Sequence, residues 1–205
     1  MTPHRLFPIA ALFLALPAAA SDDLESRAFA AVAALQQSLA PRLIQSMSED
    51  GVPAAIEVCA EEAPDIAARV AAEQGLRIGR VSTRWRNPDN APLDWHLDVL
   101  ERFRSAIEAG EPADAQRWST REKLPEGVAL RAMVGLETRG LCLACHGPAV
   151  ADEVLEAIAR RYPDDRATGF AEGDLRGAVW VEIPEAPRPQ VGAERSEAQR
   201  HRSTP

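Results

Sequence analysis

The pentapeptide Cys142-Leu143-Ala144-Cys145-His146 constrains this chain more than any other feature. Two thiols at this spacing can form thioethers to the two vinyl groups of one porphyrin, and the adjacent histidine then lies beneath the iron as its proximal ligand. A chain that carries such a group must fold around a large apolar ring. The motif therefore predicts one covalently attached haem c, held by Cys142 and Cys145, with His146 on the iron.

The same spacing also occurs in disulfides, in redox-active dithiols and in zinc sites. A zinc ribbon needs a second pair of soft ligands, but the chain has three cysteines and the third, Cys59, stands alone. A thioredoxin-like dithiol lies at a helix N-terminus after a strand, whereas here the pair precedes His146-Gly147-Pro148 without that pattern. Haem attachment is the interpretation that fits the neighbouring residues.

The N-terminal residues 1–20 are typical of a secretory signal peptide. A short basic start precedes an apolar run over 6–16, and three alanines then lead to an expected cut before Ser21. The run is too short to span a bilayer comfortably, so we expect no membrane insertion of the mature chain. Because bacteria attach haem c after export, this leader and the pentapeptide support each other, and we expect a periplasmic protein.

The C-terminal residues 184–205 begin with a proline-rich segment and continue as a polar stretch with almost nothing apolar. Such a segment cannot bury enough apolar surface to fold, so we expect a disordered tail. Residues 21–183 then form one domain with one core, which is an ordinary size for a single domain.

The chain is acidic, with a formal net charge of −8. This charge disfavours nucleic acid and anionic membranes as partners, while a cationic redox partner fits it. Lys123 is the single lysine, so any group that grips an anion must be an arginine, which suits bidentate contact with a carboxylate.

Apolar spacing predicts long helices first and scattered strands afterwards, which indicates an α+β domain with an antiparallel sheet. The expected helices cover 24–47, the segment between Gly51 and Gly75, 92–110 and 151–162, and the expected strands are 77–85, 117–120, 128–134 and 178–183. Pro64 falls inside the second helical pattern, so that helix should kink or restart about one turn after Cys59.

The second axial ligand of the iron has several candidates. Met47 and Met133 fall on apolar patterns, where filling gaps in the core is the usual role of methionine. His96 lies in an expected helix, where a lone histidine is more often a packing or surface residue. Cys59 is either an inert buried thiol or a ligand placed beside the break at Pro64, and the residues alone leave both open.

Four ordered segments resemble a bacterial domain-of-unknown-function family of exported c-type haem-binding proteins with a PAS-like fold, sometimes fused to sensor kinases or chemoreceptors. The resemblance covers residues 25 to 183, and its segments are 55–64, 79–92, 141–147 and 162–178. It implies a PAS-like antiparallel sheet and Cys59 as the axial ligand opposite His146. The chain departs from the family at Trp95-His96, where members usually carry an acidic residue after the tryptophan.

A thiolate opposite an imidazole donates strongly to the iron and favours the ferric state. We therefore expect a redox or diatomic-gas sensor that signals to a separate protein, with low-potential electron transfer as the alternative and a peroxidase-type haem enzyme third. No catalytic acid or base can be identified, so we expect no enzymatic activity. Arg84, Arg86 and Asn87 are the candidates to hold the haem propionates.

Overall fold

The structure is a computed structural model that describes residues 19–186. Apart from a few residues at their inner ends, the expected signal peptide (1–20) and the expected tail (184–205) lie outside this range. The fold is α+β, as expected, and is built on one antiparallel four-stranded sheet of order β1-β4-β3-β2. The strands are β1 (Arg77–Val81), β2 (Arg117–Thr120), β3 (Val128–Glu137) and β4 (Leu175–Pro184).

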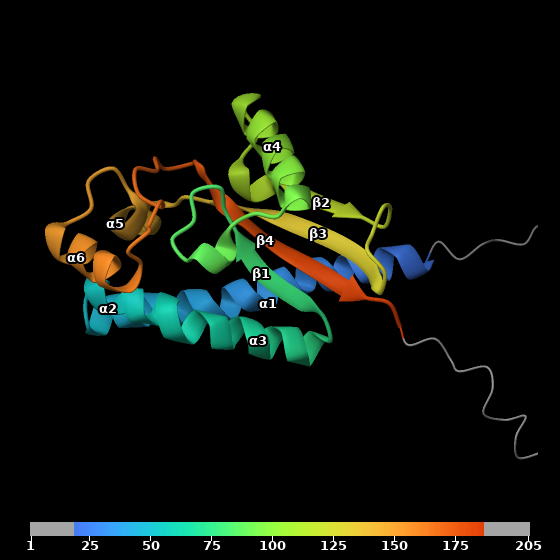
Figure 1. The fold of residues 1–205 in the computed structure, drawn as a ribbon, viewed down its shortest axis with the longest axis horizontal. Coiled ribbons are helices and arrows are strands. Elements are labelled where there is room, and N and C mark those ends of the chain that lie inside the picture. Colours follow the sequence, from blue (N-terminus) through green and yellow to red (C-terminus); the bar gives the residue numbers. More distant parts are fainter. Residues whose placement is uncertain (1–18, 187–205) are drawn as a thin grey trace, which may run out of the picture.

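Helices lie on both faces of the sheet and at one end of it (Figure 1). The long helix α1 and helix α3 run along one face, α4 stands against the other, and α2, α5 and α6 gather at one end. Their bounds are α1 (Ala19–Glu49), α2 (Val52–Glu57), α3 (Ala63–Gln74), α4 (Asp94–Glu108), α5 (Leu143–His146) and α6 (Asp152–Arg161). Among the described residues, no helix is long and apolar enough to cross a membrane.

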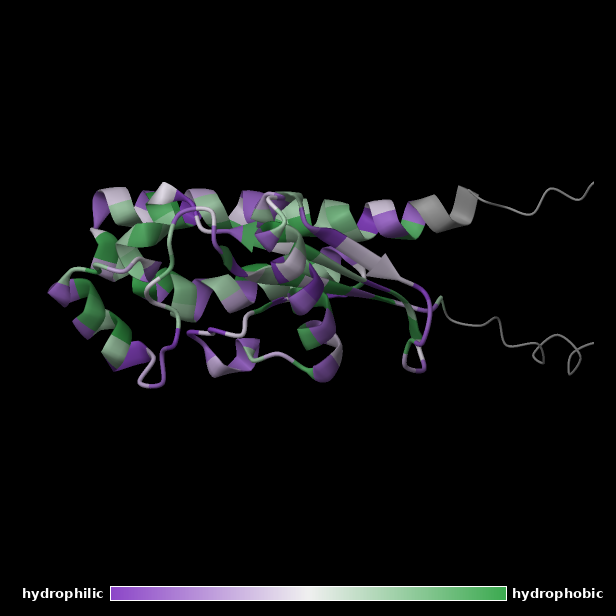
Figure 2. Ribbon diagram, turned by 90° about the horizontal axis from the view of Figure 1, so that it is seen from above, coloured by the Kyte–Doolittle hydropathy of each residue, from purple (hydrophilic) through white to green (hydrophobic). Residues whose placement is uncertain are grey.

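The main core lies between α1 and the sheet. Every second residue of β4 faces α1, and the set Val179, Val181 and Ile183 is almost fully buried there against Val32 and Leu35. Burying a side chain of this size stabilises the fold by about 1.5–3 kcal/mol each. Helix α1 is banded with apolar and polar residues along its length (Figure 2), as expected for a helix with one side on a core.

The alternate residues of β4 face a second core under α4. Ala178 and Trp180 pack there with Val99, Leu100 and Phe103 of the helix. Successive side chains of a strand point to opposite faces, so one strand supplies both cores. Of any two neighbouring residues in segment 178–181 of β4, one therefore packs in the core under α1 and the other in the core under α4.

Two prolines have different effects on the helices. Helix α1 continues through Pro41 without a break. Between α2 and α3, by contrast, the chain forms a π-helical turn, η1 (Val58–Glu62), and Pro64 follows at the start of α3. The predicted irregularity beside Cys59 is confirmed, and Cys59 lies inside the π-turn. Such turns are rare and occur often at functional sites.

One strand is shorter than the sequence pattern suggests. The β-like pattern runs over 77–85, but β1 ends at Val81. The next residue, Ser82, turns its N–H to the carbonyl of Asn90 at 3.0 Å and donates its hydroxyl to the carbonyl of Arg176 at 2.9 Å. These contacts replace the strand ladder, so residues 82–87 form a loop.

Candidate cofactor site

The cysteine pair and its histidine lie on a 3₁₀ turn and the short helix that continues it. The segment Gly140–Cys142 forms a 3₁₀ turn, and α5 follows it directly. Residues three and four apart share one face of a helix, so Cys142, Cys145 and His146 line the same cavity. Gly147 is needed here because its N–H donates to the carbonyl of Leu143 at 2.9 Å, and a Cβ would lie 2.6 Å from that oxygen.

This cavity has a volume of about 250 Å³ and a largely apolar wall. Helix α1 supplies one side of it, and Ile56 of α2, Leu136 of β3 and Leu141 contribute to the other walls. All three cysteines of the chain line it, together with His146. The residues contributed by α1 include Leu35, Leu39, Leu43 and Met47.

A second cavity of about 370 Å³ adjoins the first and is more polar. Cys59 and His146 line both cavities, so they stand where the two meet. The second cavity is bordered by Tyr162 and by Asn87 and Asn90 of the loop after β1. The two cavities together form a cleft, called here the Cys59–His146 cleft, with one apolar end and one polar end.

His146 is held in a fixed orientation. Its Nδ1 lies 2.6 Å from the carbonyl oxygen of Ala167. A carbonyl can only accept, so Nδ1 carries the hydrogen and Nε2 keeps its lone pair. Burial, with Arg176 and Arg86 adding to it, lowers the pKa of His146 to about 2. The imidazole is therefore neutral and can bind a metal through Nε2.

The thiol of Cys59 is half-buried in the wall of the cleft, and burial raises its pKa. Arg80, Arg86 and Arg176 oppose this shift because their positive charges favour the thiolate. Burial likewise raises the pKa of the Cys145 thiol, again against the charge of Arg86.

Ion pairs hold the π-turn of Cys59 on both sides. Arg42 of α1 forms a bidentate pair with Glu62, with Nε to Oε2 at 2.7 Å and Nη2 to Oε1 at 2.6 Å. Arg161 of α6 pairs with Glu57 at 2.9 Å and also with Glu61. The turn is therefore tied to two helices that come from distant parts of the chain.

Three arginines gather at the cleft, and two of them were not among the residues selected from the sequence. Arg86 is compensated, since it pairs with Asp165 at 2.9 Å and donates to the carbonyl of Cys145 at 2.7 Å. Arg80 forms no ion pair with any described residue. The Nε of buried Arg176 has no hydrogen-bond partner within residues 19–186, and burial, with Arg80 and Arg86 adding to it, lowers the pKa of Arg176 to about 9.

The other residues selected from the sequence are divided between the cleft and the rest of the fold. Arg86 and Asn87 line the cleft, but Arg84 lines a separate cavity. Met47 lines the apolar end of the cleft. His96 belongs to α4 and Met133 packs beneath that helix, so both lie on the other side of the sheet and line neither cavity of the cleft.

Tyr162, which had no role assigned from the sequence, also lines the polar end of the cleft. Burial raises the pKa of its phenol to about 12, with the charge of Cys59 as the next cause. Within the described part of the chain there is no group of three or more His, Cys, Asp or Glu side chains that could hold a metal ion.

The site is a cleft with a cysteine pair, one histidine with a free nitrogen and one further thiol, on a helix-covered antiparallel sheet. The chain belongs to the Tll0287-like family, whose model matches residues 17–184. It is similar to the cyanobacterial heme-protein Tll0287, known from a crystal structure, with 30% identity and a TM-score of 0.51 over 62% of this chain and 73% of that chain. No curated protein matches the chain at a significant level.

Proposed function

We propose that this protein binds one haem c covalently through Cys142 and Cys145, with His146 and Cys59 as the axial ligands of the iron. Its role is that of a redox or diatomic-gas sensor in the periplasm, on a PAS-like fold. Membership of the Tll0287-like family and the likeness to a heme-protein support haem binding.

One observation carries the proposal: the three cysteines and His146 line a single cavity with an apolar wall. This fits a haem in each of its parts. The cysteine pair lines the cavity and has the C-x-x-C sequence spacing of haem attachment, and His146 presents a neutral imidazole with a free Nε2. Leucines and isoleucine of the wall would cover the faces of the ring.

Cys59 fits the second axial position better than Met47 does. Both line the apolar cavity, but Cys59 also lines the polar one, as His146 does. Met47 lies near the end of α1, at the apolar end of the cleft. The positive charges of Arg80, Arg86 and Arg176 stabilise a thiolate at Cys59 and give a thioether no such benefit.

The polar end of the cleft suits the propionates. Arg80 and Arg176 have unused donors there, whereas Arg86 is already paired with Asp165. We therefore assign the propionates first to Arg80 and Arg176, with Arg86 and Asn87 beside them. Arg84, which belongs to another cavity, has no part in this assignment.

The sensor role depends on how Cys59 is held. A haem with thiolate and imidazole ligands supplies a low-potential iron that changes its affinity for the thiolate and for diatomic gases when it is reduced. Burial favours the protonated form of Cys59, while the charges of Arg80, Arg86 and Arg176 favour the thiolate. Because these effects oppose each other, Cys59 could dissociate from the iron when the haem is reduced. A separate signalling protein would then bind the altered form.

Low-potential electron transfer is a second candidate, favoured by one observation. Leu141, next to Cys142 and in the wall of the cleft, is 50% exposed. A haem held by Cys142 would thus have one edge near the surface, where a redox partner could approach. We propose no enzymatic activity for this site.

The proposal is tested by expressing the whole chain in a bacterium that matures haem c in its periplasm. We expect haem to remain on the polypeptide in a denaturing gel, and Cys142→Ala together with Cys145→Ala to abolish this. The reduced protein should then bind carbon monoxide, as a ligand-releasing sensor does. Loss of haem on denaturation would refute covalent attachment, and a reduced protein inert to carbon monoxide would favour electron transfer.

A further inference from the structure

A separate cavity of about 320 Å³ lies on the α4 side of the sheet, and the proposed haem site does not use it. It shares no lining residue with the Cys59–His146 cleft. Its walls come from the loop after β1, from α4, from the segment before β4 and from the first residues of β4. The apolar lining consists of Leu100, Ile107, Phe170 and Leu175, and the charged groups at its rim are Arg84, Arg104, Glu108 and Asp174.

The guanidinium of Arg84 is held in place although the residue is exposed. Its central carbon lies 4.0 Å from the centroid of the Phe170 ring, and its Nη2 donates to the carbonyl of Thr168. Gly169 makes room for it, since a Cβ there would lie 3.3 Å from that nitrogen. The Nε and Nη1 of Arg84 have no partner among the described residues. A fixed guanidinium with free donors is ready to bind a carboxylate.

Two arginines and two carboxylates lie at the rim, and Arg104 is also paired with Glu101 of its own helix. Glu108 and Asp174 would repel a simple anion, but they would attract the ammonium group of a ligand that also carries a carboxylate. Asp174 is itself fixed, since its Oδ2 accepts the N–H of Ala171 at 2.7 Å. The volume is at the small end for ligand pockets, which usually measure about 300–1,000 Å³.

We propose that this cavity binds an α-amino acid with an apolar side chain. Arg84 binds its carboxylate, Asp174 its ammonium group, and Leu100, Ile107 and Leu175 pack against its side chain.

Bound ligand would also affect the haem, a consequence that rests on the proposed function. Arg176, in the wall of the cleft, donates from Nη1 to the backbone carbonyl of Arg84 at 3.2 Å and to Ser82 Oγ at 3.4 Å. The amide of Arg84 in turn donates to Ser82 Oγ at 3.1 Å. A ligand bound to Arg84 therefore acts on Arg176 through the backbone of Arg84 and through Ser82, and by linkage the state of the haem changes the affinity for the ligand.

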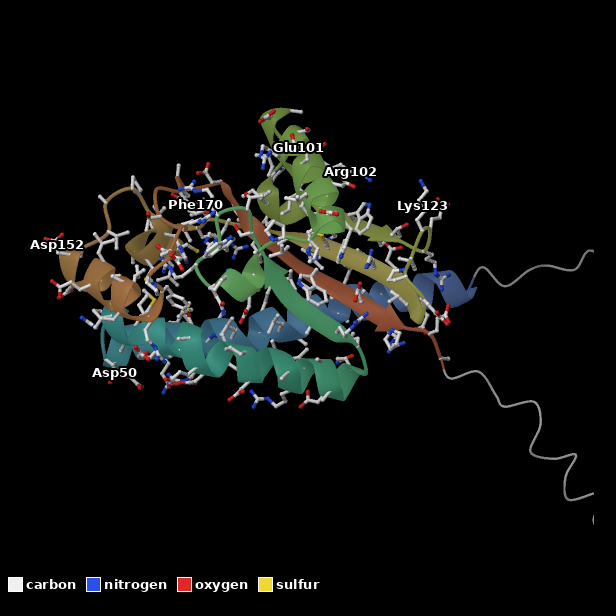
Figure 3. The ribbon with its side chains drawn as sticks, in the orientation of Figure 1. Asp50, Glu101, Arg102, Lys123, Asp152 and Phe170 are labelled. Atoms are coloured by element: carbon white, nitrogen blue, oxygen red, sulfur yellow. The ribbon has the colours of Figure 1, made fainter. Side chains whose placement is uncertain are left out.

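The experiment is isothermal titration calorimetry of the haem-loaded full chain with L-leucine and L-phenylalanine. We expect saturable binding of at least one, and none of 4-methylpentanoate or 3-methylbutylamine, which each lack one charged group of leucine. Arg84→Ala should weaken binding at least tenfold, the loss of about one charged hydrogen-bond pair. Arg102→Ala is the matched control, since Arg102 is exposed on α4 outside the cavity (Figure 3).

Absence of binding by both amino acids, equal binding of the analogues, or an unchanged affinity in Arg84→Ala would each overturn the assignment. The coupling is measured separately, as a shift of the haem reduction potential on saturation with the ligand that is lost in Arg84→Ala. An unshifted potential refutes the coupling. Because calorimetry needs no haem signal, failure to bind an amino acid by a protein with normal haem overturns this site and leaves the proposed function intact.

Discussion

His96 is expected to make the fold unstable in acid. It is buried, with 4% of its surface exposed, and its Nδ1 accepts the N–H of Leu93 at 3.0 Å at the start of α4. Nε2 therefore carries the hydrogen, and it has no hydrogen-bond partner in the described range. Burial, with the charge of Arg131 adding to it and that of Glu182 opposing it, lowers the pKa of His96 to about 4.

The direction of the effect follows from this lowered pKa. The unfolded chain, with a histidine pKa near 6.5, binds the proton more strongly than the folded chain, so protonation favours unfolding. The contribution of His96 is complete above about pH 6.5 and is lost as the pH falls from there through the folded pKa of about 4. The difference between the folded and unfolded pKa of His96 corresponds to about 3 kcal/mol of folding free energy, a large part of the stability of an ordinary domain.

The variant His96→Gln isolates this titration. Glutamine at the third position of a helix can also accept the N–H of the capping residue, but it does not titrate. Urea unfolding of wild type and variant at pH 7, 5.5 and 4 should show the wild type losing about 3 kcal/mol more than the variant over this range. Protonation of carboxylates affects both proteins and cancels. Equal losses in the two proteins would refute the buried, neutral His96.

Two substitutions test the packing and the charge pairing around the cleft. Gly79→Ala places a Cβ 2.8 Å from the ring of Trp180, so it should destabilise the fold by about 1–3 kcal/mol in urea unfolding, and an unchanged midpoint would contradict that contact. Asp165→Ala removes the partner of buried Arg86, which should cost about 3–5 kcal/mol and loosen the cysteine motif. The exposed neighbour Asp164 serves as the control, since Asp164→Ala should change stability by less than about 0.5 kcal/mol. Equal losses of stability in Asp165→Ala and Asp164→Ala would argue against the Arg86–Asp165 ion pair.

Elements defined by local patterns were predictable. The apolar spacing over 24–47 indicated α1, and the β-branched run over 178–183 indicated the central part of β4. The end of β1 was not predictable, because it depends on the hydrogen bonds of Ser82 to the carbonyls of Asn90 and Arg176. Arg176 lies more than ninety residues further along the chain. The strand order was out of reach for the same reason, since β1 pairs with the last strand.

In the site, too, the residues set by local sequence were predictable and those brought together by distant contacts were not. The pentapeptide is local in sequence, and its cysteines and histidine share one helical face as the spacing indicates. Cys59 was suggested by its place beside Pro64 and was implied by the resemblance, and the structure brings it to the same cavity. Arg80 and Arg176 were missed, because nothing in a charged strand or a glycine-rich loop shows that β1 and β4 pair beside a cleft.

The most direct test of the account is the ferric electron paramagnetic resonance spectrum of the haem-loaded protein, compared between wild type and Cys59→Ala, with Met47→Ala as the matched control from the same cleft. The account predicts a low-spin signal of the thiolate type in wild type and in Met47→Ala, and its loss in Cys59→Ala. A spectrum unchanged by Cys59→Ala would contradict ligation by Cys59, and a spectrum changed only by Met47→Ala would place methionine on the iron.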